Sequence, residues 1–228
     1  MKWGNVTKRP ARTNTALSLR QLAGIFFETF LSKNIVLVQA ISLCPIIGAG
    51  VNLQYGVVLS LCTAAVLLPT SLFMSFFGEK IPSWLRPPVY TVAASALLIG
   101  AALIVDKCIS HEIYAYLYLY LPLMAVNTIF TYRAGGFSVS NRPVAAVTDA
   151  LGSSFGFALV ICIVSALREM AAYGTLWNVP LGFSFRLPEA AAPFIGFLLL
   201  GFMAAFLQWL KSALAHLAAR HQKEGDNL

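Results

Sequence analysis

The stretch N-I-V-L-V-Q-A-I-S-L-C-P-I-I-G-A-G, residues 34–50, decides the fold that we expect for this chain. It is apolar and of membrane length, but Cys44-Pro45 and the glycines Gly48 and Gly50 interrupt it. A proline and closely spaced glycines weaken a regular helix. Inside a membrane, the backbone groups released by such a break must face protein or a cavity. We therefore expect a broken helix that lines an internal site.

A second stretch, L-Y-L-P-L-M-A-V-N-T-I-F-T-Y-R-A-G-G at residues 119–136, has the same character. It is apolar, with Pro122 inside it and Gly135-Gly136 at its end. Two interrupted apolar segments in corresponding positions of two halves indicate a site near the middle of the membrane. The sequence therefore predicts that these two stretches meet.

The composition places the chain in a membrane. Of its 228 residues, 58% are hydrophobic and 11% are charged, whereas a soluble domain carries about 25% charged residues. The first 16 residues are polar and basic, so no cleavable signal is expected. The four cysteines, at positions 44, 62, 108 and 162, form no CxxC pair and suggest no disulfide framework. We interpret Cys62 and Cys162 as apolar filler.

The pattern of charges predicts an all-α membrane protein with six transmembrane helices. No charged residue occurs between Lys33 and Glu79, which leaves room for two spans of about 20 residues. The expected segments are a basic cytoplasmic segment at 1–16, an interfacial amphipathic helix at 17–33, a six-span domain at 34–210 and a polar cytoplasmic tail at 211–228. The expected spans are 35–51, 56–77, 88–105, 114–131, 150–167 and 190–210.

The distribution of Lys and Arg predicts the topology. Six spans place 13 of the 16 basic residues on one side, and this side is expected to be cytoplasmic. Both termini are then cytoplasmic, and the net charge of +7 reflects topology and anionic lipids rather than binding to nucleic acid. Spans one to three and four to six form two inverted repeats, in each of which the first helix is interrupted near the midplane.

Several motifs carry a resemblance to a known family. They are N-I-V-L-V-Q-A-I-S-L-C-P (34–45), L-R-P-P-V-Y (85–90), L-P-L-M-A-V-N (121–127), R-A-G-G-F (133–137), D-A-L-G (149–152), L-R-E-M-A-A-Y-G-T-L-W (167–177) and P-F-I-G (193–196). With these motifs in this order, the chain resembles the Rnf/Nqr membrane subunits over roughly residues 30–210. Within that family it is most similar to the E-subunit type of Rnf and the D-subunit type of Nqr.

This resemblance implies a six-span subunit of a prokaryotic inner membrane. It implies pairing with a paralogous subunit of the RnfA/NqrE type, and association with other subunits that carry flavin and iron–sulfur centres. Each member of the pair is expected to supply two cysteines to one shared [2Fe–2S] cluster, a group that normally takes four Cys ligands. The subunit has no catalytic centre of its own.

The resemblance assigns the first cluster ligand to Cys44. At the second ligand position, after Asn127, this chain has Thr128, and a hydroxyl is not a usual cluster ligand. The family also has an acidic residue where this chain has Gly135. Asn127 and Thr128 are interpreted as partners for backbone groups released by the break, or as a polar lining for an ion or small ligand.

The remaining residues of interest have structural interpretations. Pro45 and Pro122 mark the breaks. Arg133 is expected to fix a loop at 132–149, and Asp149 to cap the following helix. Arg168 and Glu169 are expected to form an interfacial anchor with their own ion pair, or a contact with a partner subunit. Tyr114, Tyr116, Tyr118 and Tyr120 suggest an interfacial belt, or a surface for stacking a flavin or quinone.

Three functions remain open from the sequence. The first is an electron-transfer subunit of an ion-translocating complex. The second is a redox-silent relative that carries an ion or a small molecule, which Thr128 favours. The third is a structural subunit needed for assembly. No buried carboxylate pair is expected within a span, which argues against a proton relay carried by this subunit alone.

Overall fold

The computed structural model describes residues 19–32, 42–180 and 187–225. Nearly all of these residues are helical, as expected for an all-α membrane protein. Among the described residues, four helices are long and apolar enough to cross a membrane, and a fifth span is present if one bent pair of helices is counted. The first predicted span, 35–51, lies partly outside the described residues.

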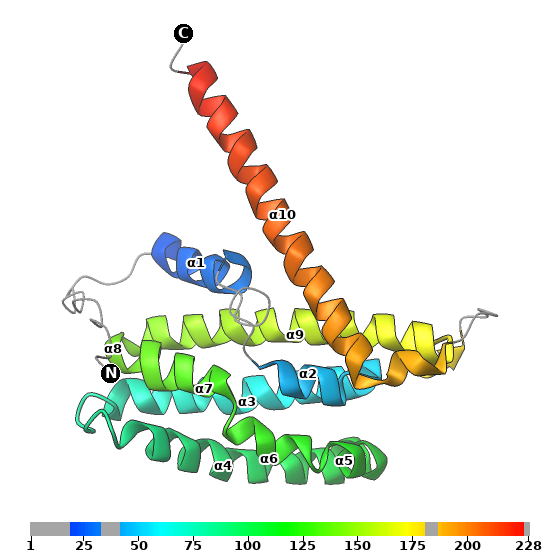
Figure 1. Cartoon of the computed structure of the whole chain (residues 1–228). Helices are drawn as coiled ribbons and strands as arrows, with labels where there is room; N and C mark the ends of the chain where they lie inside the picture. The colour runs from blue at the N-terminus through cyan, green and yellow to red at the C-terminus, as the bar shows by residue number, and fades with distance from the viewer. Residues whose placement is uncertain (1–18, 33–41, 181–186, 226–228) are drawn as a thin grey trace.

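Two long antiparallel helices form the centre of the molecule (Figure 1). They are α3 (Leu53–Phe77) and α9 (Pro143–Tyr173). Small residues allow their close approach: a β-carbon at Gly56 would lie 2.6 Å from Ser165 Oγ. Hydroxyls along both helices bond to backbone carbonyls one turn earlier, as Thr63 does to Leu59 at 2.7 Å. Such bonds satisfy polar groups where water is absent.

The expected span at 56–77 ends where α3 ends, and the span expected at 88–105 corresponds to α4 (Arg86–Ile104) followed by the π-helical turn η2 (Val105–Ile109). The loop expected at 132–149 is wrong. Most of its residues belong instead to η3 (Arg133–Phe137), α8 (Ser138–Ser140) and the start of α9, with residues 141–142 between the last two. The last predicted span, 190–210, lies within η4 (Pro188–Ala191) and α10 (Pro193–Gly225).

The second interrupted stretch is broken twice. The helix α5 (His111–Leu117) meets the segment Tyr120–Ser140 at a bend of 58°. Pro122 lies in the first turn of α6 (Tyr120–Ala125), and the bend occurs near residue 118, whose carbonyl a proline four residues later cannot engage. The second break separates α6 from α7 (Thr128–Tyr132) at residues 126–127.

Shorter elements complete the chain. The helix α1 (Leu19–Phe27) and the π-helical turn η1 (Glu28–Ser32) lie on α9, with the ring of Phe26 against Phe155. The helix α2 (Leu43–Ala49) lies beside α6. After α9, a two-stranded hairpin is formed by β1 (Thr175–Leu176) and β2 (Val179–Pro180), which the sequence analysis did not predict.

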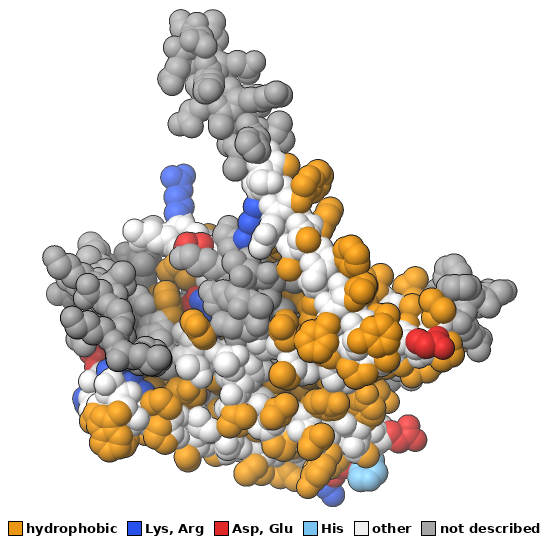
Figure 2. Space-filling view, in the orientation of Figure 1, with side chains coloured by type: hydrophobic (Ala, Val, Ile, Leu, Met, Phe, Trp, Pro, Cys, Tyr) orange, Lys and Arg blue, Asp and Glu red, His pale blue; other side chains and the backbone are white. Residues whose placement is uncertain are grey.

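The helix α10 leaves the bundle obliquely, and only its first turns contact α2, η4 and α9 (Figure 1). Its aromatic side chains are exposed, including Phe202 at 67% and Phe206 at 63%. Hydrophobic side chains are spread over the face in Figure 2, and charged side chains lie mainly at its ends and on α1. A surface of this kind is suited to lipid or to a neighbouring subunit rather than to water.

Candidate functional site

The break before α2 is held by an unusual residue. Ser42 precedes the helix with φ 66° and ψ 30°, the left-handed conformation that residues other than glycine rarely adopt. Its hydroxyl makes no capping bond to α2 and instead donates to Oδ1 of Asn127 at 2.6 Å. Pro45 lies in the first turn of α2, where its missing N–H removes no helical hydrogen bond. Pro45 therefore begins a helix rather than interrupting one.

The break between α6 and α7 is held by Asn127. This residue is extended, with φ −65° and ψ 139°, and its side chain accepts from the N–H of Ile129 at the start of α7. Its Nδ2 donates to the sulfur of Met124 at 3.4 Å. Asn127 Oδ1 is also 3.4 Å from the hydroxyl of Thr128, which donates to it. Asn127 thus accepts a hydrogen bond from a backbone N–H released by the break. Its bond with Ser42 connects this break to the other half of the chain.

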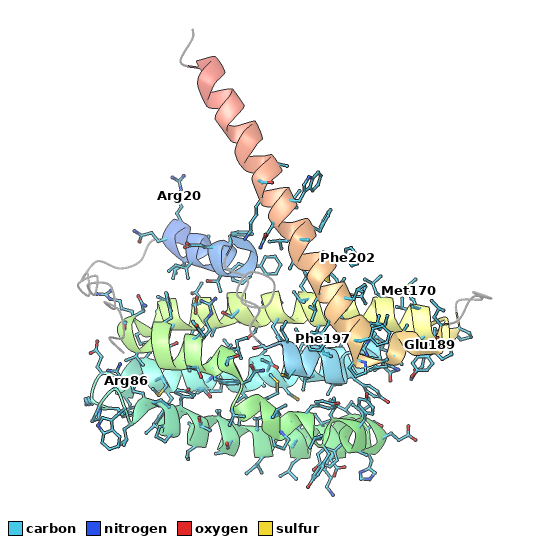
Figure 3. The ribbon with its side chains drawn as sticks, viewed as in Figure 1. Arg20, Arg86, Met170, Glu189, Phe197 and Phe202 are labelled. Atoms are coloured by element: carbon cyan, nitrogen blue, oxygen red, sulfur yellow. The ribbon has the colours of Figure 1, made fainter. Side chains whose placement is uncertain are left out.

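The two breaks line one cavity of about 460 Å³. We call it the break cavity; its walls are Ser42, Leu43, Cys44, Pro45, Leu123, Val126, Asn127, Thr128 and Phe197. Cys44 and Thr128 are both exposed, whereas Asn127 is 8% exposed. Phe197 reaches this region from α10 (Figure 3). The structure therefore brings together Cys44, Asn127 and Thr128 from the two interrupted stretches.

The donor atoms of the break cavity do not match half of a four-cysteine cluster. Cys44 is the only thiol among the residues of its wall, and Thr128 supplies a hydroxyl. Across the described ranges, no group of three or more His, Cys, Asp and Glu side chains is placed to hold a metal ion. Iron–sulfur clusters take thiolate ligands, with imidazole as the known variation. The described wall of the break cavity therefore contains one thiol, whereas the resemblance assigns two to each partner.

Arg168 and Glu169 do not pair with one another, so the expected anchor with its own ion pair is wrong. Arg168 is 0% exposed and donates only to backbone carbonyls. The acceptors are Ile47 (2.7 Å) and Gly50 (3.0 Å) at the end of α2, and Ala190 (3.2 Å), Ala191 (2.6 Å) and Ala192 (3.3 Å) around η4. A cation at the carbonyl ends of helices is favourable. Arg168 therefore joins α2, which carries Cys44, to the start of α10.

Glu169 accepts hydrogen bonds from backbone N–H groups, one of them at the amino terminus of a helix. It is 0% exposed and accepts from the N–H of Leu53 at 2.8 Å, in the first turn of α3. It also accepts from the N–H of Asn178 at 2.9 Å and the hydroxyl of Thr175 at 3.1 Å. A carboxylate is stabilised by backbone N–H groups in such a position. Glu169 thus fixes the hairpin to the start of α3.

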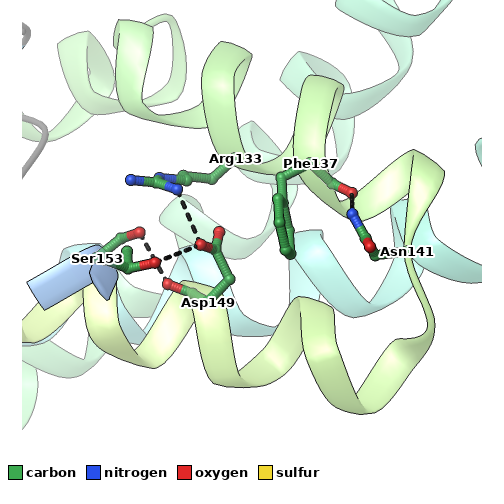
Figure 4. A network of polar contacts seen from close by, with 6 residues as sticks. Arg133, Phe137, Asn141, Asp149 and Ser153 are labelled. Atoms are coloured by element: carbon green, nitrogen blue, oxygen red, sulfur yellow. Dashed lines mark hydrogen bonds and ion pairs between the residues drawn. The ribbon is translucent and has the colours of Figure 1, made fainter. Parts of the chain in front are cut away.

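Arg133 and Asp149 form a buried ion pair, with Nη1 2.8 Å from Oδ1 (Figure 4). The same Oδ1 accepts from the hydroxyl of Thr29 at 2.8 Å, so the pair also holds η1. Asp149 does not cap α9 as expected, because α9 begins at Pro143. With Glu169, it is one of two buried carboxylates within α9, and both lie outside the span expected at 150–167. At about 1.5 Å per residue they lie about 30 Å apart, so they do not act as a pair.

The sequence analysis missed Ser42, Phe197 and the hairpin as parts of these sites. The dipeptide Trp177-Asn178 has positive φ at both residues, 57° and 61°. Asn in such a turn is a recognisable sign, but Trp is not. The break at Ser42 has no sequence sign, because serine does not favour a left-handed conformation.

Comparison with known proteins identifies relatives across most of the chain. A family model described as Rnf-Nqr subunit, membrane protein, matches residues 22–207. The E subunit of the ion-translocating oxidoreductase complex from Shewanella piezotolerans (strain WP3 / JCM 13877) is 31% identical over 141 residues, which are 62% of this chain and 61% of that protein. Proteins with the same name from Shewanella amazonensis and Shewanella loihica are each 30% identical over 154 residues, or 68% of this chain and 66% of theirs. The matched part is thus less than two thirds of each relative's length.

Proposed function

The chain belongs to the Rnf-Nqr family of membrane subunits, and from this membership we propose that it is an integral membrane subunit of an ion-translocating electron-transport complex. The relatives from Shewanella bear the name of an ion-translocating oxidoreductase complex. The observation that carries the proposal is the break cavity, where the start of α2 meets the break between α6 and α7 from the other half of the chain. Interrupted helices that face one another are typical of sites inside membranes.

The same proposal includes the arrangement in the membrane. Six spans as two inverted repeats are supported by the matching order of elements, since α2 precedes α3 and α4 as α6 and α7 precede α9 and α10. Cys44 and Thr128 are exposed on the break cavity, and this exposure supports the proposal that a paralogous subunit completes the cavity. Flavin- and iron–sulfur-carrying subunits would be its further partners, in the inner membrane of a prokaryote with both termini cytoplasmic.

The cofactor of this site is proposed to differ from the family pattern. At the two expected ligand positions this chain has one thiol, of Cys44, and one hydroxyl, of Thr128. A shared [2Fe–2S] cluster with four cysteines therefore cannot be assembled by the usual two-plus-two arrangement. The proposed role of Cys44, Asn127 and Thr128 is to shape and line the contact between the two halves and the partner.

The test uses the complex isolated from membranes under anaerobic conditions through a tag on this chain. Co-purification of a second family member together with flavin-carrying subunits is the expected result. Iron and the EPR spectrum are then measured for the wild type, for Cys44→Ser and for Thr128→Cys. We expect no signal that depends on Cys44 in the wild type, and a new one in Thr128→Cys. Two irons per pair that are lost in Cys44→Ser would contradict this cofactor proposal, because a partner would then supply a replacement ligand.

A second candidate function is supported by the same oxygen atoms. Ser42, Asn127 and Thr128 provide a hydroxyl, an amide oxygen and another hydroxyl around one point, which resembles the polar lining of a carrier for an ion or small solute. A protein that purifies alone, without redox partners, and that moves a solute in proteoliposomes would favour this function.

A further inference from the structure

A second cleft lies away from the break cavity, where α3 begins and α9 ends. Its volume is about 380 Å³, and we call it the tyrosine cleft; it is lined by Val51, Asn52, Tyr55, Tyr116, Tyr173, Thr175 and Asn178. None of these residues lines the break cavity. Every residue of the wall is neutral, and all except Val51 can form hydrogen bonds through the side chain. The function proposed above assigns no role to this cleft.

The walls of the tyrosine cleft are held by hydrogen bonds, three of them to the buried carboxylate of Glu169. Glu169 lies behind them and bonds to the backbone of Leu53 and Asn178 and to the hydroxyl of Thr175. The amide of Asn52 donates to Asn178 at 2.8 Å, which in turn donates to Gln54 at 3.2 Å. The start of α3 and the chain from the end of α9 through the hairpin, which are distant in sequence, are thus fixed around one space. A site with walls fixed in this way is preorganised for a ligand.

The cleft is rich in aromatic surface and in phenol hydroxyls. The rings of Tyr55 and Tyr116 are stacked, with centroids 4.3 Å apart and planes inclined by 15°. Tyr173 is 46% exposed. The hydroxyls of Tyr55 and Tyr173 form no hydrogen bond with any residue that the structure describes.

We infer that the tyrosine cleft binds a planar aromatic ring that carries carbonyl oxygens, the chemistry shared by a quinone headgroup and the isoalloxazine ring of a flavin. Aromatic walls stack on a flat ring, and the phenol and amide groups donate to its carbonyls. The volume suits a ring system of this size. No charged residue lines the cleft, which favours a neutral ring over an ion. The inference concerns binding alone.

The experiment is a titration of the purified full-length chain in detergent with menadione and, separately, with riboflavin, followed by quenching of tryptophan and riboflavin fluorescence. The hydroxyl variants Tyr55→Phe and Tyr173→Phe keep the rings, whereas Tyr173→Ala removes one. The matched controls are Tyr132→Phe and Tyr132→Ala, since Tyr132 is 55% exposed on α7 and lies outside the cleft. Circular dichroism and melting temperature verify that every variant is folded.

We expect saturable binding that weakens about 10-fold in Tyr173→Ala and by a smaller factor in the hydroxyl variants, with no change in the Tyr132 controls. Binding of menadione alone identifies a ring delivered from the lipid, and binding of riboflavin alone identifies a water-soluble ring. Equal affinity in all variants would show partition into the micelle and would overturn the inference, as would the absence of saturable binding by the folded wild type. Because the isolated chain is used, either failure leaves membership of the complex untouched.

Discussion

At the scale of single residues, the burial of a charge determines how far its loss lowers the free energy of unfolding. Arg133 and Asp149 have side chains that are 10% and 2% exposed. Removing one member of such a pair leaves the other charge buried without compensation, which costs about 3–5 kcal/mol. An exposed pair costs much less to break, because water solvates the remaining charge. The chain contains both kinds and therefore permits a direct comparison.

We predict that Asp149→Asn lowers the free energy of unfolding by about 3 kcal/mol or more. The measurement is denaturant unfolding in detergent, followed by circular dichroism. The matched control is Asp106→Asn, which removes the partner of His111 in a pair whose histidine side chain is 81% exposed; its effect is expected to stay within about 0.5 kcal/mol. Equal effects of the two substitutions would contradict the importance assigned to the buried pair.

Gly48 permits a contact between the two interrupted stretches. A β-carbon at this position would collide with the ring of Tyr120, so Gly48→Ala is predicted to lower stability by about 1–3 kcal/mol, as overpacking does. Gly100 in α4 is the control, since nothing lies within 4 Å of a β-carbon there. Gly100→Ala should raise stability by about 0.5–1 kcal/mol. Melting temperatures that move in the same direction for both variants would refute this contrast.

At the scale of elements, the apolar runs were predictable and the polar interruptions were not. The helix α3 was predicted because a charge-free run ends at Gly78 and Glu79. The helical course of residues 133–149 was missed because Arg133, Gly135 and Pro143 are typical of a loop. In the structure, Asp149 neutralises Arg133, and the ring of Tyr90 covers Gly135, where a β-carbon would lie 2.8 Å from it. Both compensations come from distant parts of the chain, which local sequence patterns do not reveal.

In the candidate site, too, the sequence predicted some features and did not reveal others. The sequence predicted that Cys44 and Thr128 lie on two broken helices, and the structure brings both to one cavity. It did not predict how the breaks are held, because the bond from Ser42 to Asn127 joins residues 85 positions apart. It also assigned Arg168 and Glu169 to each other, since adjacent opposite charges suggest a pair. On a helix, adjacent residues point in different directions, and these two reach different partners.

Glu169 connects three elements, and its loss should release the hairpin. We predict that Glu169→Gln weakens the bonds to Leu53 and Asn178, because a neutral amide is a poorer acceptor than a carboxylate. Hydrogen exchange of the backbone amides in residues 175–180 should become about 10-fold faster or more. Glu189→Gln is the control, because Glu189 is exposed in η4. Unchanged exchange in the hairpin of Glu169→Gln would show that the strand pairing alone holds it.

At the scale of the whole molecule, the two ends of the bundle should lie on opposite sides of the membrane. Cys108, in η2, is exposed near one end. Ser83, in the loop between α3 and α4, is exposed near the other end. The helix α4 lies between them and is long enough to cross the hydrocarbon core. The excess of Lys and Arg on the side of Ser83 predicts that this side is cytoplasmic.

We therefore predict that a membrane-impermeant maleimide labels Cys108 in intact cells, in a variant whose other three cysteines are replaced by Ser or Ala. Ser83→Cys, introduced together with Cys108→Ser, should be labelled only after the cells are opened. The reagent reaches a thiol only through water, so the two variants report the two sides independently of stability. Labelling of Ser83→Cys but not of Cys108 in intact cells would reverse the topology. Labelling of both would mean that α4 does not cross the membrane, and the arrangement of inverted repeats would then fail.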